Sequence, residues 1–175
     1  EFFPNDYDQF FSGGYPARQL SFPRFTHATR ATLAGVAVDS DGALSISFLK
    51  SVNGILKGTP FELAYRALNE LLLSVACQNP IDEAGLMATW DDFVMMKVLP
   101  RIEGDNEKLA GSASDGTNVI ERLITLLEEQ FKAIIEANRP DFYRQTTDLI
   151  TVRSIKKLKW MQTRLSNNGF TSFWP

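Results

Sequence analysis

The sequence predicts a mainly α-helical protein: a helical bundle of about five helices, preceded by an irregular, aromatic-rich arm and containing at most one or two short strands. Three observations support this class. From residue 43 onward, apolar residues recur every three or four positions, which places them on one face of a helix. Apolar residues make up 44% of the 175-residue chain, enough for a packed core. Before residue 26, glycine and proline interrupt a stretch that holds eight of the 20 aromatic residues.

Residues 1–42 form the predicted arm, which we interpret either as an irregular segment that wraps the helices or as the edge of a missing sheet domain. Within it, Gly35–Asp39 is predicted to be one short strand, followed by a turn. Residues 43–175 form the helical part. Because the chain begins with Glu1 rather than methionine, we expect further protein upstream of it.

Two helices open the helical part. The first begins at about residue 43, with Asp41 as its N-cap, and stops at Gly58. The second carries an apolar stripe over Phe61–Val75 and leaves Arg66 on its polar side.

The third helix is predicted from about Asp82 to Leu99, where Pro100 closes it because proline disfavours helix in the residue before it. The following stretch, 104–116, is polar and rich in glycine and serine. It is predicted to be a mobile surface loop.

Two more helices follow. One opens at Asn118, where Glu121 three residues later indicates a capping box, and it ends near Asn138. The last begins after Thr151 and ends at Gly169, which favours a left-handed C-cap. The final Phe-Thr-Ser-Phe-Trp residues are predicted to fold back into a groove, since three aromatic side chains are costly to leave in water.

Charge is unevenly distributed along the chain. Residues 1–138 hold 11 basic and 19 acidic side chains, whereas 139–175 hold 7 basic and 2 acidic ones. Such asymmetry is typical of a nucleic-acid or partner surface, and packing of a basic helix on an acidic neighbour explains it equally well. The candidate nucleic-acid or partner surface consists of Arg153, Lys156, Lys157, Lys159 and Arg164.

Few residues are suited to metal or nucleophilic chemistry. Cys77 and His27 are the only residues of their types, which excludes a disulfide scaffold and a zinc module, and we expect no metal site. Cys77 lies on an apolar helix and is predicted to be buried and inert. The adjacent carboxylates are interpreted as solvated faces and helix caps, because neighbours on a helix do not face one another: Asp82-Glu83, Asp91-Asp92 and Glu128-Glu129.

The chain also lacks membrane and export signals. No apolar run approaches the ~20 residues of a membrane span. The N-terminus lacks the basic region of a signal peptide. We therefore predict a cytoplasmic location with no membrane partner.

Several segments together resemble one protein family. Residues 47–57 (SFLKSVNGILK) and 61–70 (FELAYRALNE) look like two helices near the C-terminus of McrB-like AAA+ ATPases. Residues 92–104 (DFVMMKVLPRIEG) resemble the family's KVLPKLHG stretch. Residues 157–174 (KLKWMQTRLSNNGFTSFW) resemble its GFTSFW terminus, and residues 1–8 look like the chain that leaves the last strand of the ATPase core.

This resemblance implies that 1–42 is the edge of an ATPase core and that 43–175 is a helical lid with a C-terminal extension. The parent would be a ring-forming motor of DNA restriction or phage defence that uses ATP or GTP with Mg²⁺. Its implied partners are the upstream AAA+ core, neighbouring ring subunits, a nuclease subunit and DNA. The lid by itself would hold no cofactor and catalyse nothing.

Arg66 matches the place of the family's sensor-two arginine, which reaches the γ-phosphate from the lid. A guanidinium offers fixed paired donors to phosphate oxygens and stays charged, so it suits this role. This chain has Ala64 where the family usually has glycine. The alternative for Arg66 is a solvated helix residue that pairs with Glu62 or Glu70 one turn away.

Two other functions remain open from the sequence. One is an autonomous helical interaction module that binds a protein partner or DNA through its basic last helix. The other is a metal-free enzyme built on the carboxylates, for which the spacing gives no support. A lid is expected to expose an apolar patch where its core would pack, whereas an autonomous module is expected to be polar there.

Overall fold

The computed structural model describes residues 27–110, 116–142 and 149–175, and in these ranges the chain is mainly α-helical, as predicted. The predicted arm before His27 lies outside the described residues. Five helices have eleven or more residues: α3 (Ala43–Leu56), α4 (Tyr65–Gln78), α5 (Glu83–Phe93), α7 (Val119–Gln130) and α9 (Arg153–Asn168). Three short helices accompany them: α2 (Arg30–Leu33), α6 (Asn106–Leu109) and α8 (Lys132–Ala137).

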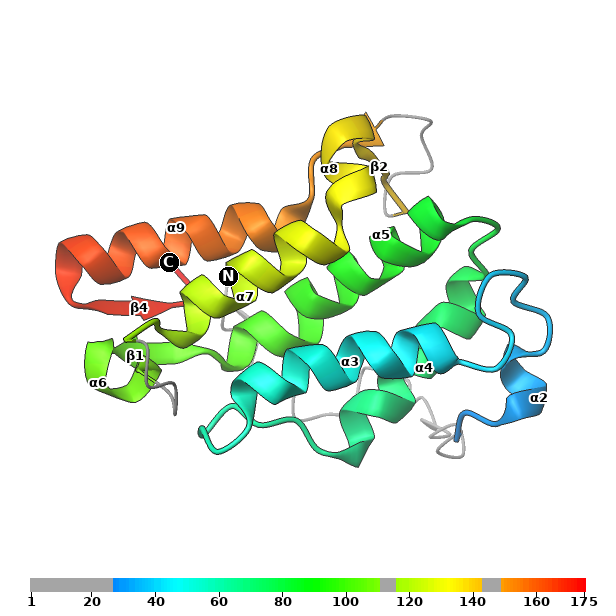
Figure 1. Cartoon of the computed structure of the whole chain (residues 1–175), viewed down its shortest axis with the longest axis horizontal. Coiled ribbons are helices and arrows are strands. Elements are labelled where there is room, and N and C mark those ends of the chain that lie inside the picture. Colours follow the sequence, from blue (N-terminus) through cyan, green and yellow to red (C-terminus); the bar gives the residue numbers. More distant parts are fainter. Residues whose placement is uncertain (1–26, 111–115, 143–148) are drawn as a thin grey trace, which may run out of the picture.

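The long helices pack around one apolar core. α7 contacts both α3 and α9, and α5 contacts both α4 and α9 (Figure 1). Trp90 of α5 is buried and stacks on Phe48 of α3 with the ring centroids 4.6 Å apart. Its indole N–H donates to the hydroxyl of Ser45 at 2.9 Å, so the polar edge of the buried ring is satisfied.

The predicted strand at Gly35–Asp39 is wrong. This segment forms turns between α2 and α3. The carboxylate of Asp39 accepts hydrogen bonds from the backbone N–H groups of Leu44 (3.0 Å) and Ser45 (3.1 Å). The buried carboxylate thus supplies hydrogen-bond acceptors for N–H groups in the first turn of α3. This capping contact keeps the segment in turns, so it does not extend into a strand.

The second helix begins later than the apolar stripe indicates. Phe61 is buried but precedes α4, which starts at Tyr65. The helix ends at Asn79, which adopts a left-handed conformation (φ 46°) and donates its backbone N–H to the carbonyl of Val75.

The third predicted helix consists of an α-helix, a π-helix and a 3₁₀ helix that follow one another along the chain. α5 begins after Asp82, whose side chain accepts from the N–H of Gly85 at 2.7 Å. It continues into a π-helix over Val94–Val98 and a 3₁₀ helix over Leu99–Arg101, so Pro100 lies inside the helical run instead of ending it. π-helical turns often accompany functional sites, and this one leaves Met96 half exposed.

The predicted loop at 104–116 is ordered over its first part. Glu103–Asp105 forms β1, which α6 follows, and Leu109 is fully buried. β1 pairs antiparallel with β4 (Phe170–Ser172), as Figure 1 shows. Residues 111–115 lie outside the described residues.

The tail folds back as predicted, because β4 pairs with β1. Its aromatic side chains are only partly covered. Phe173 packs against the core, whereas Phe170 and Trp174 are exposed. A second small sheet joins β2 (Arg139–Pro140) to β3 (Leu149–Ile150), so the described strands are four short ones, more than predicted.

The predicted start of α7 and the predicted end of α9 are confirmed. Asn118 and Glu121 form the predicted capping box at the start of α7. Gly169 (φ 70°) is the left-handed C-cap of α9. Phe131 separates α7 from α8, which divides the fourth predicted helix.

Within the described ranges, no helix combines the length and apolar character needed to cross a membrane.

Two glycines should respond oppositely to alanine. Gly104 has φ +149°, and a Cβ there would come within 2.9 Å of the Cβ of Lys108, so Gly104→Ala should lower the free energy of unfolding. Gly54 lies exposed inside α3 with nothing within 4 Å, so Gly54→Ala should raise it by about 0.5–1 kcal/mol. Urea unfolding of both variants measures the difference. If both substitutions changed the free energy of unfolding equally and in the same direction, the result would contradict the requirement for glycine at position 104 in β1.

Candidate functional site

The N-terminus of α4 presents the arginine that the sequence singles out. Arg66 lies in the first turn of α4 with its side chain 75% exposed. Its Nε donates to Glu70 Oε1 at 2.8 Å, the pairing one turn away that the sequence offered as the alternative. No other partner of this guanidinium occurs among the described residues. An exposed arginine that uses only Nε internally keeps its terminal nitrogens available for an anion.

The backbone at this helix end is also suited to an anion. The N-cap residue is Ala64, and no side chain caps the first N–H groups of α4. Unsatisfied N–H groups at the start of a helix carry partial positive charge and attract phosphate or carboxylate. Ala64 has φ −100° and ψ 173°, a conformation that alanine adopts without strain. Alanine is therefore compatible with the backbone at this position.

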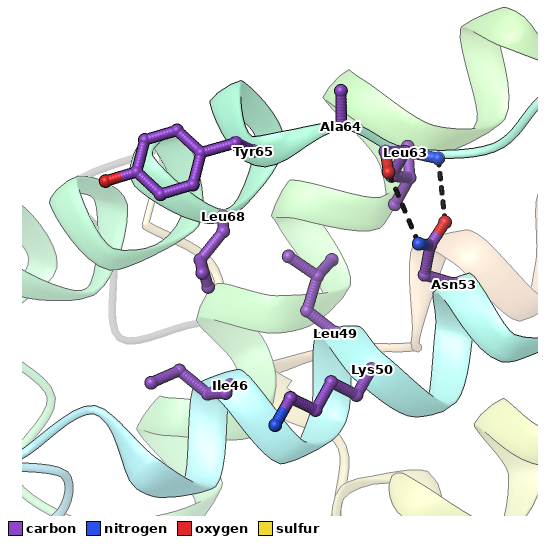
Figure 2. Close-up of a pocket in the computed structure, with 8 residues that line it drawn as sticks. All are labelled: Ile46, Leu49, Lys50, Asn53, Leu63, Ala64, Tyr65 and Leu68. Atoms are coloured by element: carbon purple, nitrogen blue, oxygen red, sulfur yellow. Dashed lines mark hydrogen bonds between the residues drawn. The ribbon is translucent and has the colours of Figure 1, made fainter.

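A side chain of α3 is hydrogen-bonded to the backbone of the segment that leads into α4. Asn53 accepts from the backbone N–H of Leu63 at 2.7 Å and donates to its carbonyl at 3.3 Å (Figure 2). An open apolar groove lies beside this clamp, and Tyr65, 72% exposed, stands at its edge. The groove is lined by Ile46, Leu49, Lys50, Asn53, Leu63, Ala64, Tyr65 and Leu68.

Glu70 connects Arg66 to the π-helix. Its second oxygen accepts from Lys97 Nζ at 3.0 Å. Partial burial alone would raise the pKa of the Glu70 carboxyl, but the hydrogen bonds from Lys97 and Arg66 outweigh it and hold the pKa below its ordinary value. Two cations therefore share one carboxylate, and removing one of them leaves the other paired.

The basic residues predicted to form a partner surface are arranged in three ways. Arg153 donates to Asp92 at 3.1 Å and to Asp141 at 2.8 Å, so it is engaged in internal ion pairs. Lys159 pairs with Glu128 at 2.6 Å. The other three predicted residues lie with the exposed rings of Trp160 and Trp174 and the partly buried ring of Phe173. We call this group the aromatic–basic surface: Lys156, Lys157, Trp160, Arg164, Phe173 and Trp174.

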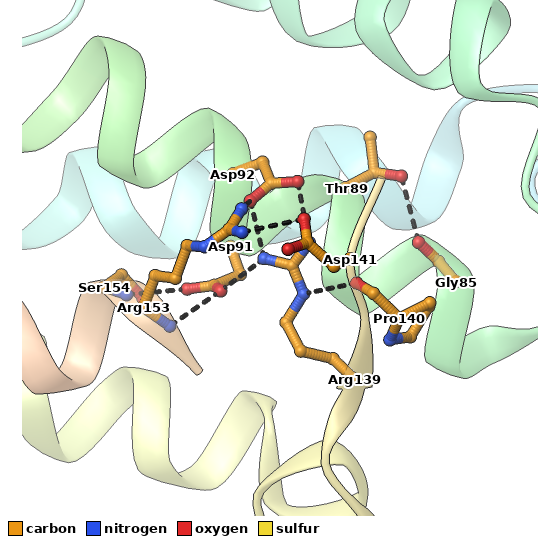
Figure 3. Close-up of polar contacts among 9 residues, drawn as sticks. All are labelled: Gly85, Thr89, Asp91, Asp92, Arg139, Pro140, Asp141, Arg153 and Ser154. Carbon is orange, nitrogen blue, oxygen red and sulfur yellow. Dashed lines mark hydrogen bonds and ion pairs between the residues drawn. The ribbon is translucent and has the colours of Figure 1, made fainter. Parts of the chain in front are cut away.

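The interpretation of Asp91 and Asp92 as solvated carboxylates is wrong. Both are buried, and the guanidinium of Arg139, itself fully buried, lies between them (Figure 3). Arg139 Nη1 is 2.7 Å from Asp91 Oδ2, and Nη2 is 2.7 Å from Asp92 Oδ2. Burial alone would lower the pKa of Arg139, but the hydrogen bonds that its guanidinium donates to Asp92 and Asp91 outweigh this effect and raise the pKa. The arginine therefore stays charged inside the fold.

Asp91 also caps the last helix. Its two carboxylate oxygens accept from the backbone N–H groups of Arg153 (2.9 Å) and Ser154 (2.8 Å), the first residues of α9. Asp91 and Asp92 are adjacent on α5 and do not face one another. They belong to one cluster because Arg139 and the start of α9 approach both of them from other parts of the chain. The sequence signal was the position of the acidic pair between Trp90 and Phe93, inside a stretch whose apolar residues are buried. With all these oxygens engaged, the cluster is a structural ion-pair network.

The remaining candidate residues lie apart from these sites. Cys77 is exposed on the last turn of α4, contrary to the prediction that it is buried. His27 is exposed at the start of the described chain. Across the described ranges, no three His, Cys, Asp or Glu side chains are grouped so as to hold a metal ion.

These features define a small helical domain with two exposed candidate surfaces and a buried ionic centre. The chain belongs to a family described as a domain of unknown function (DUF8727), whose model matches residues 33–170. No curated protein and no solved structure matches it. The family match runs from the last residue of α2 to the first residue of β4, so it contains the N-terminus of α4 and the buried ionic centre.

The Glu70 carboxyl should titrate below 4.5, its ordinary value. Because folding lowers this pKa, the ion pairs add stability above the unfolded pKa and lose it as the pH falls through the folded pKa. Carboxyl NMR titration measures the midpoint, which should rise in Lys97→Ala and in Arg66→Ala. Lys132→Ala, a change of an exposed lysine on α8, is the control and should leave it unchanged. A wild-type midpoint at or above 4.5 would contradict the geometry.

Arg139→Ala should lower the free energy of unfolding by about 3–5 kcal/mol, because it leaves the buried carboxylate of Asp91 without its cation and leaves Asp92 with Arg153 alone. Lys159→Ala removes a surface ion pair and should cost less than about 1 kcal/mol. Urea denaturation followed by circular dichroism measures both values. A loss below about 1 kcal/mol in Arg139→Ala would show that the cluster does not hold the fold together.

Proposed function

We propose that this chain is a helical lid domain of a McrB-like AAA+ nucleoside triphosphatase, in which Arg66 senses the terminal phosphate of the nucleotide. One observation carries the proposal: an exposed arginine stands in the uncapped first turn of α4, directly beside an open apolar groove. This is where a lid needs both an anion contact and a surface for its core.

The chemistry of the site fits a triphosphate that another domain holds. A guanidinium and free helix N–H groups both attract phosphate oxygens. The groove between α3 and α4 offers an apolar surface against which a core domain can pack. In this proposal the upstream core supplies the phosphate loop, the Mg²⁺ site and the residues that read ATP or GTP. The lid contributes Arg66 and contacts to neighbouring ring subunits.

Glu70 is the internal partner that Arg66 would leave for a phosphate. Without nucleotide, Arg66 pairs with Glu70. When a phosphate attracts the guanidinium, Glu70 keeps Lys97 as its partner, so the carboxylate does not become an unpaired charge. The movement of Arg66 toward nucleotide thus costs little, and the lid angle can follow the nucleotide state. A nuclease subunit that reads this angle, and DNA as its substrate, complete the proposed restriction or phage-defence system.

A second candidate function is an autonomous interaction module. The aromatic–basic surface favours it, because it groups cations and exposed aromatic rings well away from Arg66 along the chain. The two functions use different residues, so one protein can carry both.

Arg66→Ala in the full-length protein should reduce nucleoside-triphosphate hydrolysis by about tenfold or more, since it removes a charged contact to the transferred phosphate. The thermal midpoint of the chain should change little, because an exposed ion pair contributes less than about 1 kcal/mol. Arg66→Lys should restore part of the activity. Steady-state phosphate release and thermal unfolding are the two measurements.

Arg101→Ala is the matched control, because Arg101 is also exposed but lies in the 3₁₀ helix. It should retain wild-type hydrolysis. Wild-type hydrolysis in Arg66→Ala would refute the sensor role. Turnover of ATP or GTP by the 175-residue chain alone would contradict the proposal that the lid is not catalytic.

A further inference from the structure

We propose that the aromatic–basic surface binds single-stranded nucleic acid, with Trp174 as the stacking platform for a base and its three cations as phosphate contacts. The proposal names the partner of the second candidate function and rests on that function alone. It does not depend on Arg66 or on nucleotide.

The cations of this surface are not neutralised by the protein. Among the described residues, no carboxylate pairs with Lys156, Lys157 or Arg164, although Lys159 on the same helix does have one. Partial burial lowers the pKa of the Lys157 ammonium, and the neighbouring charge of Arg164 lowers it further. Like charges held together without a counter-ion favour an anionic ligand, since a bound phosphate relieves their repulsion.

Aromatic rings contact two of these cations, Lys157 and Arg164. The Nζ of Lys157 lies 3.7 Å from the centroid of the Trp160 ring and 4.8 Å from that of Phe173. Arg164 lies 4.8 Å from the Trp160 centroid. Residues 157, 160 and 164 follow the helical spacing of three and four, so they share one face of α9. The charges of Lys157 and Arg164 are therefore presented together at the ring of Trp160.

Trp174 is the ring available for stacking. It is 63% exposed, whereas Trp160 is 36% exposed and already carries both cations. Its carbonyl accepts from Ser172 Oγ at 2.6 Å and from Arg164 Nη1 at 3.3 Å. Phe173 meets it edge to face with the centroids 4.8 Å apart. A fixed backbone reduces the conformational entropy that this tryptophan loses on binding.

The surface around these rings is hollowed. One open groove is lined by Phe173, Trp174 and the methionines of the π-helix, and a second by Lys156, Lys157 and Trp160. The two adjoin, because Met95 and Arg153 line both. A chain of alternating bases and phosphates needs apolar and basic positions side by side, as this surface offers.

Single strands fit this arrangement better than duplexes or acidic peptides. The bases of a duplex are stacked on one another and cannot reach Trp174. An acidic peptide would use the cations but would gain little from an exposed indole. Stacking on an aromatic side chain is worth about five-fold to 150-fold in affinity for each base, and it tolerates any base sequence.

The test is binding of fluorescein-labelled oligo(dT) to the complete 175-residue chain, measured by anisotropy at several salt concentrations. Trp174→Ala should weaken binding at least about fivefold, and Trp174→Phe should restore most of it. Lys157→Ala should weaken binding and reduce the slope of log affinity against log salt by about 0.7. Circular dichroism confirms that each variant is folded.

Ile81→Ala and Lys132→Ala are matched controls, since they remove an exposed apolar side chain and an exposed lysine elsewhere on the protein. Both should bind like wild type. Unchanged affinity in folded Trp174→Ala would overturn the proposal, as would tighter binding of duplex DNA or equal competition by polyglutamate of matched charge. Binding of polyglutamate without binding of oligo(dT) would also overturn it, while leaving the interaction module itself standing.

Discussion

The buried carboxylate of Asp91 organises the fold more than any other group. It lies on α5, accepts the first backbone N–H groups of α9, and pairs with the guanidinium of Arg139 on β2. Three segments far apart in the sequence therefore meet at one side chain. A charge in an apolar interior must be fully paired, so this geometry admits little variation in how α9 enters the bundle. Because α9 carries most of the aromatic–basic surface, the position of that surface follows from Asp91.

The two exposed surfaces are linked through the π-helix. Lys97 of the π-helix shares Glu70 with Arg66, and Met95 and Met96 of the same segment line the groove beside Trp174. Such π-helical turns are rare and often occur at functional sites. The ion pairs of Arg66 and the groove beside Trp174 therefore both involve the same five-residue segment.

The sequence was sufficient where short-range rules decide the outcome. The capping box at Asn118, the left-handed end at Gly169 and the apolar face that buries Trp90 all follow from residues within a few positions of one another. It failed where distant residues decide. The pair Asp91-Asp92 is typical of a protein surface, and only the contact with the distant Arg139 shows that it is buried. Gly35–Asp39 has the composition of a strand, but the hydrogen bonds of Asp39 to the first turn of α3 hold it in turns. For the candidate sites, the helix that carries Arg66 and the basic face of α9 could be predicted. The arrangement of Lys157, Trp160 and Phe173 could not, because it depends on how the tail folds back.

The antiparallel pairing of β1 with β4 has a consequence for the order of folding. Glu103 pairs with Ser172, so the ladder joins a segment near the middle of the chain to one at its end. Forming this contact in an unfolded chain would cost the entropy of closing a long loop. The pairing therefore becomes favourable only after the intervening helices have packed. All the described helices precede β4 along the chain, so they leave the ribosome before it does. The platform of Trp174 and Phe173 can therefore be assembled only after these helices have been made.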